Sequence, residues 1–506
     1  MVYSPPNVKV NVLQNPRIIN ISEQVQIPAL IGTGPMTIYV VDEAVARGVS
    51  ALDSLQVYPG VNVVIQKVTK RTGVQYVSGS SSNSVDAITG LYGSLYLPSG
   101  SSIGGQIIAG YTAGTTGQIT WSQDPVAVAT GTVPATGSTY YVSYSYSVDS
   151  TQFDPTVFSD KTSIIAKYGE ENNVSGSLAI GGSIVLENGS PAVVLCQVSG
   201  STPTESGYRT AIDKLRKKTN IEEVVLLFPT GSLAAGLRMN SHVYLYQHVQ
   251  LMNLAERWRG MFFSVGSPYY NPADSSSVFD TIGDSSTAGT YLGVASQFAH
   301  PDVTLVAPSY VWRTDSNNSR IELDGGYAAA AVAGVASAQT LRSTPITGFT
   351  VTGINIETDK WDMFQMNSLG AGGVLVLQNA NGVITIRDSI TTSTTSADTQ
   401  ERSVVSQRRK VQRVLSTQLF NIYTNKGKTI NASTISDVAA SVRTILNSLR
   451  NQGEIYGYGI VDNPSTGETK ISAVQDTTEP RQINISCSVK YLYPLKFLVV
   501  NVNLFV

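Results

Sequence analysis

The first twenty residues predict one strand that is set apart from the rest of the chain. Prolines flank it at Pro5, Pro6 and Pro16. Three valines alternate with polar residues and give it one apolar face: Val8, Val10 and Val12. A lone strand cannot pair its own backbone groups, so this N-terminal arm (1–20) requires a sheet to join. That sheet belongs either to the same chain or to a neighbouring copy, and the pattern leaves both open.

The next segment, 21–163, predicts a β-rich domain that is inserted or peripheral. Between Gly73 and Asp149 there is no Lys, Arg or Glu, whereas Gly, Ser, Thr and Tyr are abundant. Apolar and polar residues alternate through 138–148, and Gly and Pro mark turns along the whole span. Ile, Val and Tyr recur regularly, which favours an all-β module over a disordered segment.

From 164 to 344 the pattern changes to apolar runs that alternate with helical periodicity. Strands are expected at 192–198, 224–228, 261–265 and 303–306. Helices are expected at 208–218, with Ser206 as its cap, and at 243–259, 287–298 and 325–339. Strands that are apolar throughout and alternate with helices predict an α/β domain with a mostly parallel sheet.

The last segment, 345–506, predicts a mixed domain. A hairpin is expected from 373 to 387, a long helix at 399–423, and a second helix from Ser436 to the stop at Gly453. Strands follow at 483–489 and 495–506. The final strand is apolar on both faces to its last residue, as at Phe497, Val499 and Leu504. Such a strand is an aggregation hazard when free, so it is either central in a sheet or received by one.

Composition narrows the class of protein. Charged residues make up 14% of the 506 residues, well below the usual ~25%, and the formal net charge is −2. This sparse charge suits a surface that copies of the same protein cover, and it gives no global nucleic-acid or membrane footprint. Cys196 and Cys487 lie far apart in apolar or strand-like runs, as expected of buried free thiols in a reducing compartment. The start lacks a signal-peptide pattern and no run is long enough to span a bilayer, so synthesis and folding in a cytosol are expected.

Residues that could carry chemistry are few. The three histidines, His242, His248 and His300, lack the spacing of a helical metal site. A G-x-S-x-G match at 100–104 is followed by a Gly-rich segment that cannot start a helix, so the context of a nucleophile elbow is missing. Two Gly-rich segments, 32–35 and 370–373, fail the phosphate-loop and dinucleotide patterns. We therefore expect no enzyme, no cofactor and no metal.

One basic cluster stands out in this weakly charged chain. Arg402, Arg409 and Arg413 share one face of the first long helix by their spacing, and Arg443 lies on the second. The face is either simply solvated or an electrostatic contact with an acidic partner, which is protein or nucleic acid. The absence of interleaved aromatic residues weakens the nucleic-acid alternative.

In their order along the chain, several segments resemble the contractile phage tail sheath family. They are "ALIGTGP" (29–35), "IIAKYG" (164–169), "AIGGSIVLENGSPAVVLCQV" (179–198), "VAPSYVW" (306–312), "GGYAAAAVAGVASAQ" (325–339), "RRKVQRVLSTQL" (408–419) and "LRNQGEIYGY" (449–458). The resemblance covers about two thirds of the chain and lies in the order of the segments more than in any one motif. The module at 73–149 departs from it, and the resemblance leads us to expect that this β-rich domain (21–163) protrudes outward.

The resemblance implies an α+β multidomain subunit: an α/β sheath domain with an inserted all-β domain, and a C-terminal domain completed by exchanged terminal strands. Family members form homo-oligomeric six-fold rings stacked around a tail tube protein, between baseplate and tail terminator proteins. On this basis the protein is expected in a virion, assembled in the host cytoplasm, without direct nucleic-acid contact or membrane insertion. Contraction drives the tube through the host envelope for genome ejection. The four arginines are the candidate tube contact.

Three alternatives stay open. The first is the sheath of a related contractile apparatus, of bacteriocin, secretion or extracellular injection type. The second is a baseplate or receptor-binding protein, which the Gly/Ser/Tyr-rich module at 73–149 suggests. The third is a soluble enzyme built on the α/β domain, which would need clustered titratable residues.

Overall fold

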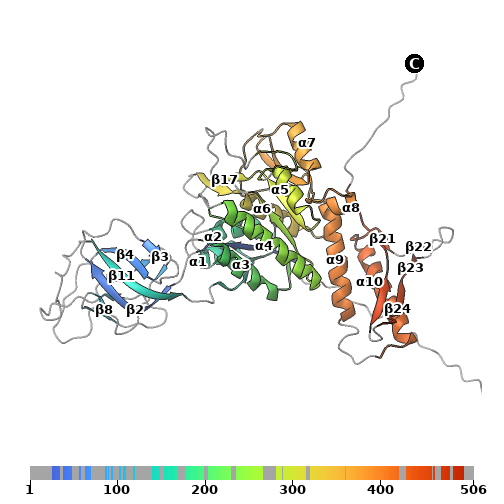
Figure 1. Ribbon diagram of the computed structural model, residues 1–506, viewed down its shortest axis with the longest axis horizontal. Helices are drawn as coiled ribbons and strands as arrows, with labels where there is room; N and C mark the ends of the chain where they lie inside the picture. The colour runs from blue at the N-terminus through green and yellow to red at the C-terminus, as the bar shows by residue number, and fades with distance from the viewer. Residues whose placement is uncertain are drawn as a thin grey trace, which may run out of the picture. The chain divides into compact units, whose positions relative to one another are not determined.

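A computed structural model describes residues 25–34, 153–168, 177–198, 203–229, 235–265, 281–287, 289–314, 320–358, 360–420, 429–458, 471–478 and 482–494 (Figure 1). Between 38 and 148, and at 460–461 and 469–470, it describes only the backbone of short strands. The described chain divides into two compact units. The larger unit comprises Gln26–Thr340 and Ile346–Arg402, and the smaller comprises Leu341–Pro345 and the chain from Ser403 onward. The expected exchange strands, with Val8, Val10, Val12, Phe497, Val499 and Leu504, lie outside the described residues.

An eight-stranded sheet forms the centre of the larger unit. Its order is β12-β13-β1-β14-β15-β16-β19-β20. The six inner strands are parallel, and the two outer strands, which have three and four residues, run antiparallel to their neighbours. The bounds are β12 Thr156–Phe158, β13 Val193–Gln197, β1 Ile27–Gly32, β14 Ile221–Leu226, β15 Gly260–Phe263, β16 Val303–Ala307, β19 Val374–Ala380 and β20 Val383–Ile386. The mostly parallel sheet is as predicted. β19 and β20 come from the segment after Thr344, so the sheet also includes residues beyond the domain boundary expected there.

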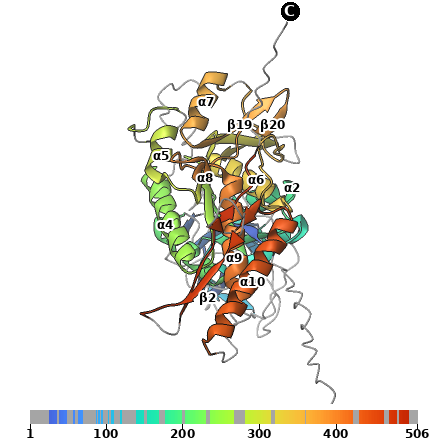
Figure 2. The same ribbon diagram turned by 90° about the vertical axis from the view of Figure 1, so that its right-hand side faces the viewer.

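Helices cover both faces of this sheet (Figure 2). One face packs on α1 (Lys161–Tyr168), α2 (Ser177–Glu187) and α6 (Gly325–Ala338). The other packs on α3 (Glu205–Lys214), α4 (Ala235–Leu254), α5 (Tyr291–Phe298) and α7 (Met363–Ala371). Successive strand residues alternate between the two cores: Leu30 belongs to the first and Ile31 to the second. A strand buried on both faces is apolar at every position, which is why these strands read as continuous apolar runs.

Small residues allow α2 and α6 to approach closely. α6 is buried at every position from Gly325 to Ser337, and most of its side chains are alanine. A Cβ atom at Gly334 would lie 2.7 Å from the carbonyl oxygen of Val185 in α2, so only glycine fits at this contact. The predicted Ala/Gly helix is thus confirmed as the inner helix of this layer.

Among the helix ends that differ from the prediction, three are explained by local backbone chemistry. α3 begins at Glu205, since Thr204 and not Ser206 is its cap: Thr204 Oγ1 accepts the N–H of Gly207 at 3.1 Å. α4 ends at Leu254, before the expected 259, because Glu256 adopts a left-handed φ of 57°. α10 begins at Ala432, where Asn431 accepts the N–H of Thr434 at 2.8 Å, and not near Ser436.

The smaller unit is built on two long helices, α9 (Arg402–Leu419) and α10 (Ala432–Asn451) (Figure 2). Val411 and Val414 of α9 pack with Val442, Ile445 and Leu449 of α10 in one core. Short strands accompany them in antiparallel pairs: β21 (Gly457–Tyr458) with β26 (Val489–Lys490), β22 (Ile460–Val461) with β23 (Thr469–Lys470), and β24 (Ser472–Gln475) with β25 (Ile483–Ser486).

Short strands also occupy the region that was expected to be all-β. Four of them form an antiparallel sheet in the order β2-β11-β4-β3: β2 (Ile38–Arg47), β11 (Thr139–Val148), β4 (Val63–Thr69) and β3 (Gln56–Tyr58). The alternating run at 138–148 is therefore a strand, as predicted. A second sheet has the order β5-β10-β9-β8: β5 (Asp86–Ala87), β10 (Gln118–Ile119), β9 (Gln106–Ala109) and β8 (Ser102–Ile103).

Candidate functional site

The larger sheet has the topology of ligand-binding α/β folds. Such folds bind ligands in a crevice at the carboxyl ends of the strands, where the strand order reverses. β1 lies between β13 and β14, which makes the β1/β14 boundary the point where the strand order reverses. Here the N–H of Thr33 donates to Ser177 Oγ at 2.7 Å, and the N–H of Ser177, at the start of α2, donates to Thr33 Oγ1 at 3.1 Å. Both residues are buried. The helix N-terminus that would receive an anion is therefore bonded by the chain itself.

The start of α6, at the same edge of the sheet, is also closed by the chain. Asp324 caps it by accepting the N–H of Gly326 at 2.9 Å, and its other carboxylate oxygen binds Arg238 Nη1 at 2.5 Å. Burial raises the pKa of Asp324, and Arg238 opposes that rise. A Cβ atom at Gly326 would lie 2.7 Å from the carbonyl oxygen of Leu226, so helix and strand leave no space between them here.

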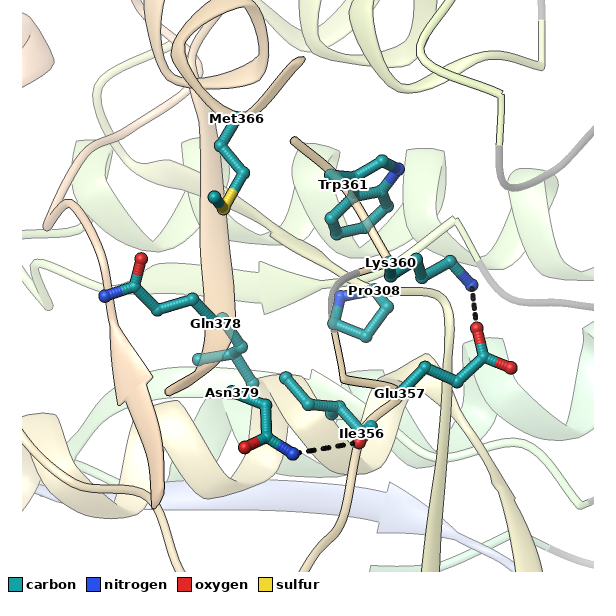
Figure 3. Close-up of a pocket in the computed structure, with 9 residues that line it drawn as sticks. Pro308, Ile356, Glu357, Lys360, Trp361, Met366, Gln378 and Asn379 are labelled. Carbon is teal, nitrogen blue, oxygen red and sulfur yellow. Dashed lines mark hydrogen bonds and ion pairs between the residues drawn. The ribbon is translucent and has the colours of Figure 1, made fainter. Parts of the chain in front are cut away.

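A pocket of the larger unit lies at the carboxyl ends of β16 and β19 (Figure 3). It is lined by Pro308, Ile356, Glu357, Lys360, Trp361, Met366, Leu377, Gln378 and Asn379. Its polar rim is internally paired: Lys360 Nζ lies 3.6 Å from Glu357 Oε2, and Asn379 Nδ2 donates to the carbonyl oxygen of Ile356 at 3.3 Å. Its volume of about 40 Å³ accommodates water, whereas ligand pockets hold roughly 300–1,000 Å³.

The histidines take structural positions. His242 packs between the rings of Phe228 and Phe263, and burial lowers its pKa to about 3. His248 accepts from Arg259 Nη1 at 2.9 Å, and burial followed by that charge lowers its pKa to about 3. Nδ1 of His300 accepts the N–H of Asp302 at 3.1 Å. Among the described residues, no group of three His, Cys, Asp or Glu side chains could hold a metal ion, and no helix could cross a membrane.

The G-x-S-x-G match gains no catalytic context. Ser102 begins β8, which pairs with β9 in a short hairpin, so the next described element is a strand and not a helix. The other three residues of the motif, Gly100, Ser101 and Gly104, lie outside the described residues.

The structure separates the four arginines of the candidate tube contact. Arg402, Arg409 and Arg413 are buried, whereas Arg443 is exposed. Arg402 Nη2 lies 3.1 Å from Glu223 Oε1, and its guanidinium lies 4.8 Å from the centroid of the Phe262 ring. The three residues therefore share a helical face, as their spacing predicts, but in the isolated subunit that face does not point into solvent. Whether any of the four contacts a tube stays a prediction.

The smaller unit contains a two-stranded sheet whose side chains are largely exposed. Among the described strands, β24 and β25 pair with one another only. Most of their side chains are exposed, including Val474 at 53% and Ile485 at 36%. A short two-stranded sheet with exposed apolar side chains is suited to accept another strand. The sequence did not single out 472–475, because four residues between turns carry too little periodicity.

Comparison with known proteins identifies the fold of the chain. No protein-family model and no curated protein matches the chain. Among solved structures, the helical sheath of the anti-feeding prophage in its contracted state matches with a TM-score of 0.51 at 12% identity, over 70% of this chain and 89% of that one. The chain has a contractile sheath fold.

Two further sheath proteins match with lower TM-scores. The sheath of the PVC extracellular contractile injection system in its contracted state matches with 0.48 at 12% identity, over 70% of this chain and 87% of that one. The sheath tail protein of Listeria innocua matches with 0.44 at 10% identity, over 93% of both chains. The likeness to the anti-feeding prophage sheath, at 12% identity, establishes the fold alone. The role of this chain is a separate question.

Proposed function

We propose that the protein is the structural subunit of a contractile tail sheath. It polymerises as stacked six-fold rings around a tail tube protein, between baseplate and tail terminator proteins, and its contraction drives the tube through a host envelope for genome ejection. It acts in the virion after assembly in the host cytoplasm. The observation that carries the proposal is the sheath fold, and a two-stranded sheet with exposed apolar side chains in the smaller unit supports it.

Copies are joined by strand addition at β24 and β25. The arm with Val8, Val10 and Val12 and the terminal strand with Phe497, Val499 and Leu504 come from neighbouring copies and extend this pair. Main-chain hydrogen bonds supply the affinity, and exposed side chains such as Val474 and Ile485 supply apolar contacts. This accounts for the strand patterns at the two ends of the chain, because an isolated strand cannot pair its own backbone groups.

Contraction is a rigid-body rearrangement of subunits from a metastable extended state, with the exchanged strands as tethers. The tube contact has to break during this step, so weak exposed ion pairs suit it better than a large apolar surface. Arg443 on α10 is the exposed member of the four candidate arginines and takes this role.

Electron microscopy of the purified full chain at rising concentration tests the proposal. We expect helical tubes. Small particles of uniform size at every concentration would contradict it.

The sheath of an injection apparatus of bacteriocin, secretion or extracellular type is the alternative, because the sheath fold does not distinguish it from a phage tail. Particles purified from producing cells separate the two: a nucleic-acid-filled head on the sheathed tail supports a phage, and headless particles support the alternative. A baseplate or receptor-binding role would instead give a compact oligomer without tubes.

A further inference from the structure

One buried side chain of α9 holds the backbone of the chain near its C-terminal end. Gln407 is 1% exposed, and its amide pairs with both backbone groups of Leu492. Its Nε2 donates to the carbonyl oxygen of Leu492 at 2.9 Å, and its Oε1 accepts the N–H of Leu492 at 2.9 Å. This is the hydrogen-bond pattern that a neighbouring strand would offer, here supplied by a helix side chain.

The residues just before Leu492 are held by backbone pairing. Lys490 and Val489 pair with Gly457 and Tyr458 in the β21–β26 ladder. The N–H of Tyr456 also donates to the carbonyl oxygen of Lys490 at 2.9 Å. This ladder is only two residues long, so the Gln407 amide adds a second attachment point, on a long helix, immediately after it.

Leu492 is three positions before the apolar segment 495–506, which the proposed function assigns as an exchanged strand. We propose that Gln407 is a positioning residue that fixes the root of this strand to α9. Force that the neighbouring copy exerts on the strand is then transmitted directly to α9. It does not separate the two-residue β26 from β21. This inference rests on the proposed function for its purpose, but the clamp itself is a property of the single subunit.

The variant Gln407→Leu removes both hydrogen bonds to Leu492, and a third from Nε2 to the carbonyl oxygen of Ser403 within α9, while it keeps a buried side chain of similar size. It leaves the N–H and C=O of Leu492 without the partners that Gln407 supplies. Gln412→Leu is the matched control. It makes the same change on the same helix, at a side chain that forms neither of the two hydrogen bonds to Leu492. Hydrogen exchange measured on the full chain should accelerate roughly 10- to 100-fold in 489–494 for the first variant, with no change for the second.

Gln407→Glu gives a sharper test. A protonated carboxylic acid donates one hydrogen bond and accepts another, as the amide does, whereas a carboxylate can only accept and faces the Leu492 carbonyl oxygen. Burial favours the protonated form. After correction for intrinsic exchange rates, this variant should behave like Gln407→Leu at about pH 8 and like the unmodified protein at about pH 5. A side chain with a purely packing role would show no such recovery.

The consequence for assembly is measured on tubes of the full chain. Tubes of Gln407→Leu should dissociate at a lower urea concentration than tubes of Gln412→Leu, while both subunits unfold at similar urea concentrations. Equal exchange in 489–494 for the two variants, or equal tube stability, would overturn the inference. If the unmodified chain forms no tubes, the proposed function fails instead, and the exchange measurements still decide whether Gln407 holds Leu492.

Discussion

His242 illustrates how burial fixes the charge of a single residue. Its ring lies 5.4 Å from that of Phe228 and 4.9 Å from that of Phe263, centroid to centroid. Burial, and secondly the charge of Arg238, lower its pKa to about 3. In an unfolded chain the pKa of histidine is near 6.5. Between these two values the unfolded chain binds a proton that the folded protein excludes.

The free energy of unfolding should therefore fall as the pH drops from about 6.5 to 3, since protonation favours the unfolded chain in that window. His242→Phe keeps an aromatic ring and removes this titration. Relative to the unmodified protein, the variant should gain about 2 kcal/mol between pH 7.5 and pH 5, at about 1.4 kcal/mol per pH unit. Urea unfolding at both pH values measures this change.

Tyr246→Phe is the control for that experiment, because it alters a ring of the same aromatic cluster and leaves His242 in place. Its stability difference from the unmodified protein should be the same at both pH values. A difference for His242→Phe that does not change with pH would show that His242 is not held neutral in the folded protein.

At the scale of elements, the packing of α2 on α6 depends on the missing side chain of Gly334. Gly334→Leu places atoms where the carbonyl oxygen of Val185 and the Cβ atom of Asn188 already lie, at 2.7 and 2.9 Å from a Cβ atom. Overpacking of this kind typically costs 1–3 kcal/mol, which exceeds the gain of about 1 kcal/mol from replacing a helical glycine. We expect a net loss of about 1 kcal/mol in unfolding free energy, measured by urea denaturation.

Gly236→Leu makes the same substitution in α4, where a Cβ atom would meet nothing within 4 Å and the residue is exposed. Its unfolding free energy should rise by up to about 1 kcal/mol, because a helical glycine is replaced without a clash. Equal effects of the two substitutions would mean that the α2–α6 contact tolerates a side chain.

The elements of the larger unit could be predicted from sequence because the strands are buried on both faces. Val193–Gln197 and Val303–Ala307 are apolar runs of the right length between helices, and no other element fits them. The first residues of the helices were harder to predict from sequence. Thr204 and Ser206 are both good caps, and only the backbone conformation of Thr204 decides between them. Positions of this kind depend on the path of the preceding chain, which local sequence does not contain.

The candidate site was less predictable than the fold, and the arginines show why. Helical spacing places Arg402, Arg409 and Arg413 on one face, but it does not tell whether that face meets solvent or protein. Glu223, the partner of Arg402, lies on β14, 179 positions earlier in the chain. A contact over that separation follows from the fold and not from any local pattern.

At the scale of the whole molecule, folding and assembly are expected to depend on different parts of the chain. The cores of the larger unit and of the smaller unit are formed by residues between Ile27 and Ile471. Deletion of Leu495–Val506 leaves these cores intact and removes the proposed exchanged strand. The shortened protein should be a folded monomer that does not form tubes.

Circular dichroism, size-exclusion chromatography and electron microscopy check the deletion. The matched control replaces the same twelve residues by a Gly/Ser segment of equal length, which separates the effect of chain length from that of apolar side chains. We expect the control to fail in assembly as well. Tubes of normal length from the deletion variant would contradict strand exchange at the C-terminus.

The two outer strands of the large sheet bear on how much unassembled protein a cell can accumulate. β12 and β20 are short and antiparallel, so the described sheet ends on each side in a strand with few free backbone groups. Such ends discourage lateral stacking into amorphous precipitate. If only the smaller unit carries strand edges that pair with other copies, a producing cell can accumulate the unassembled subunit to high concentration. Polymer growth then waits for a nucleus that engages the smaller unit.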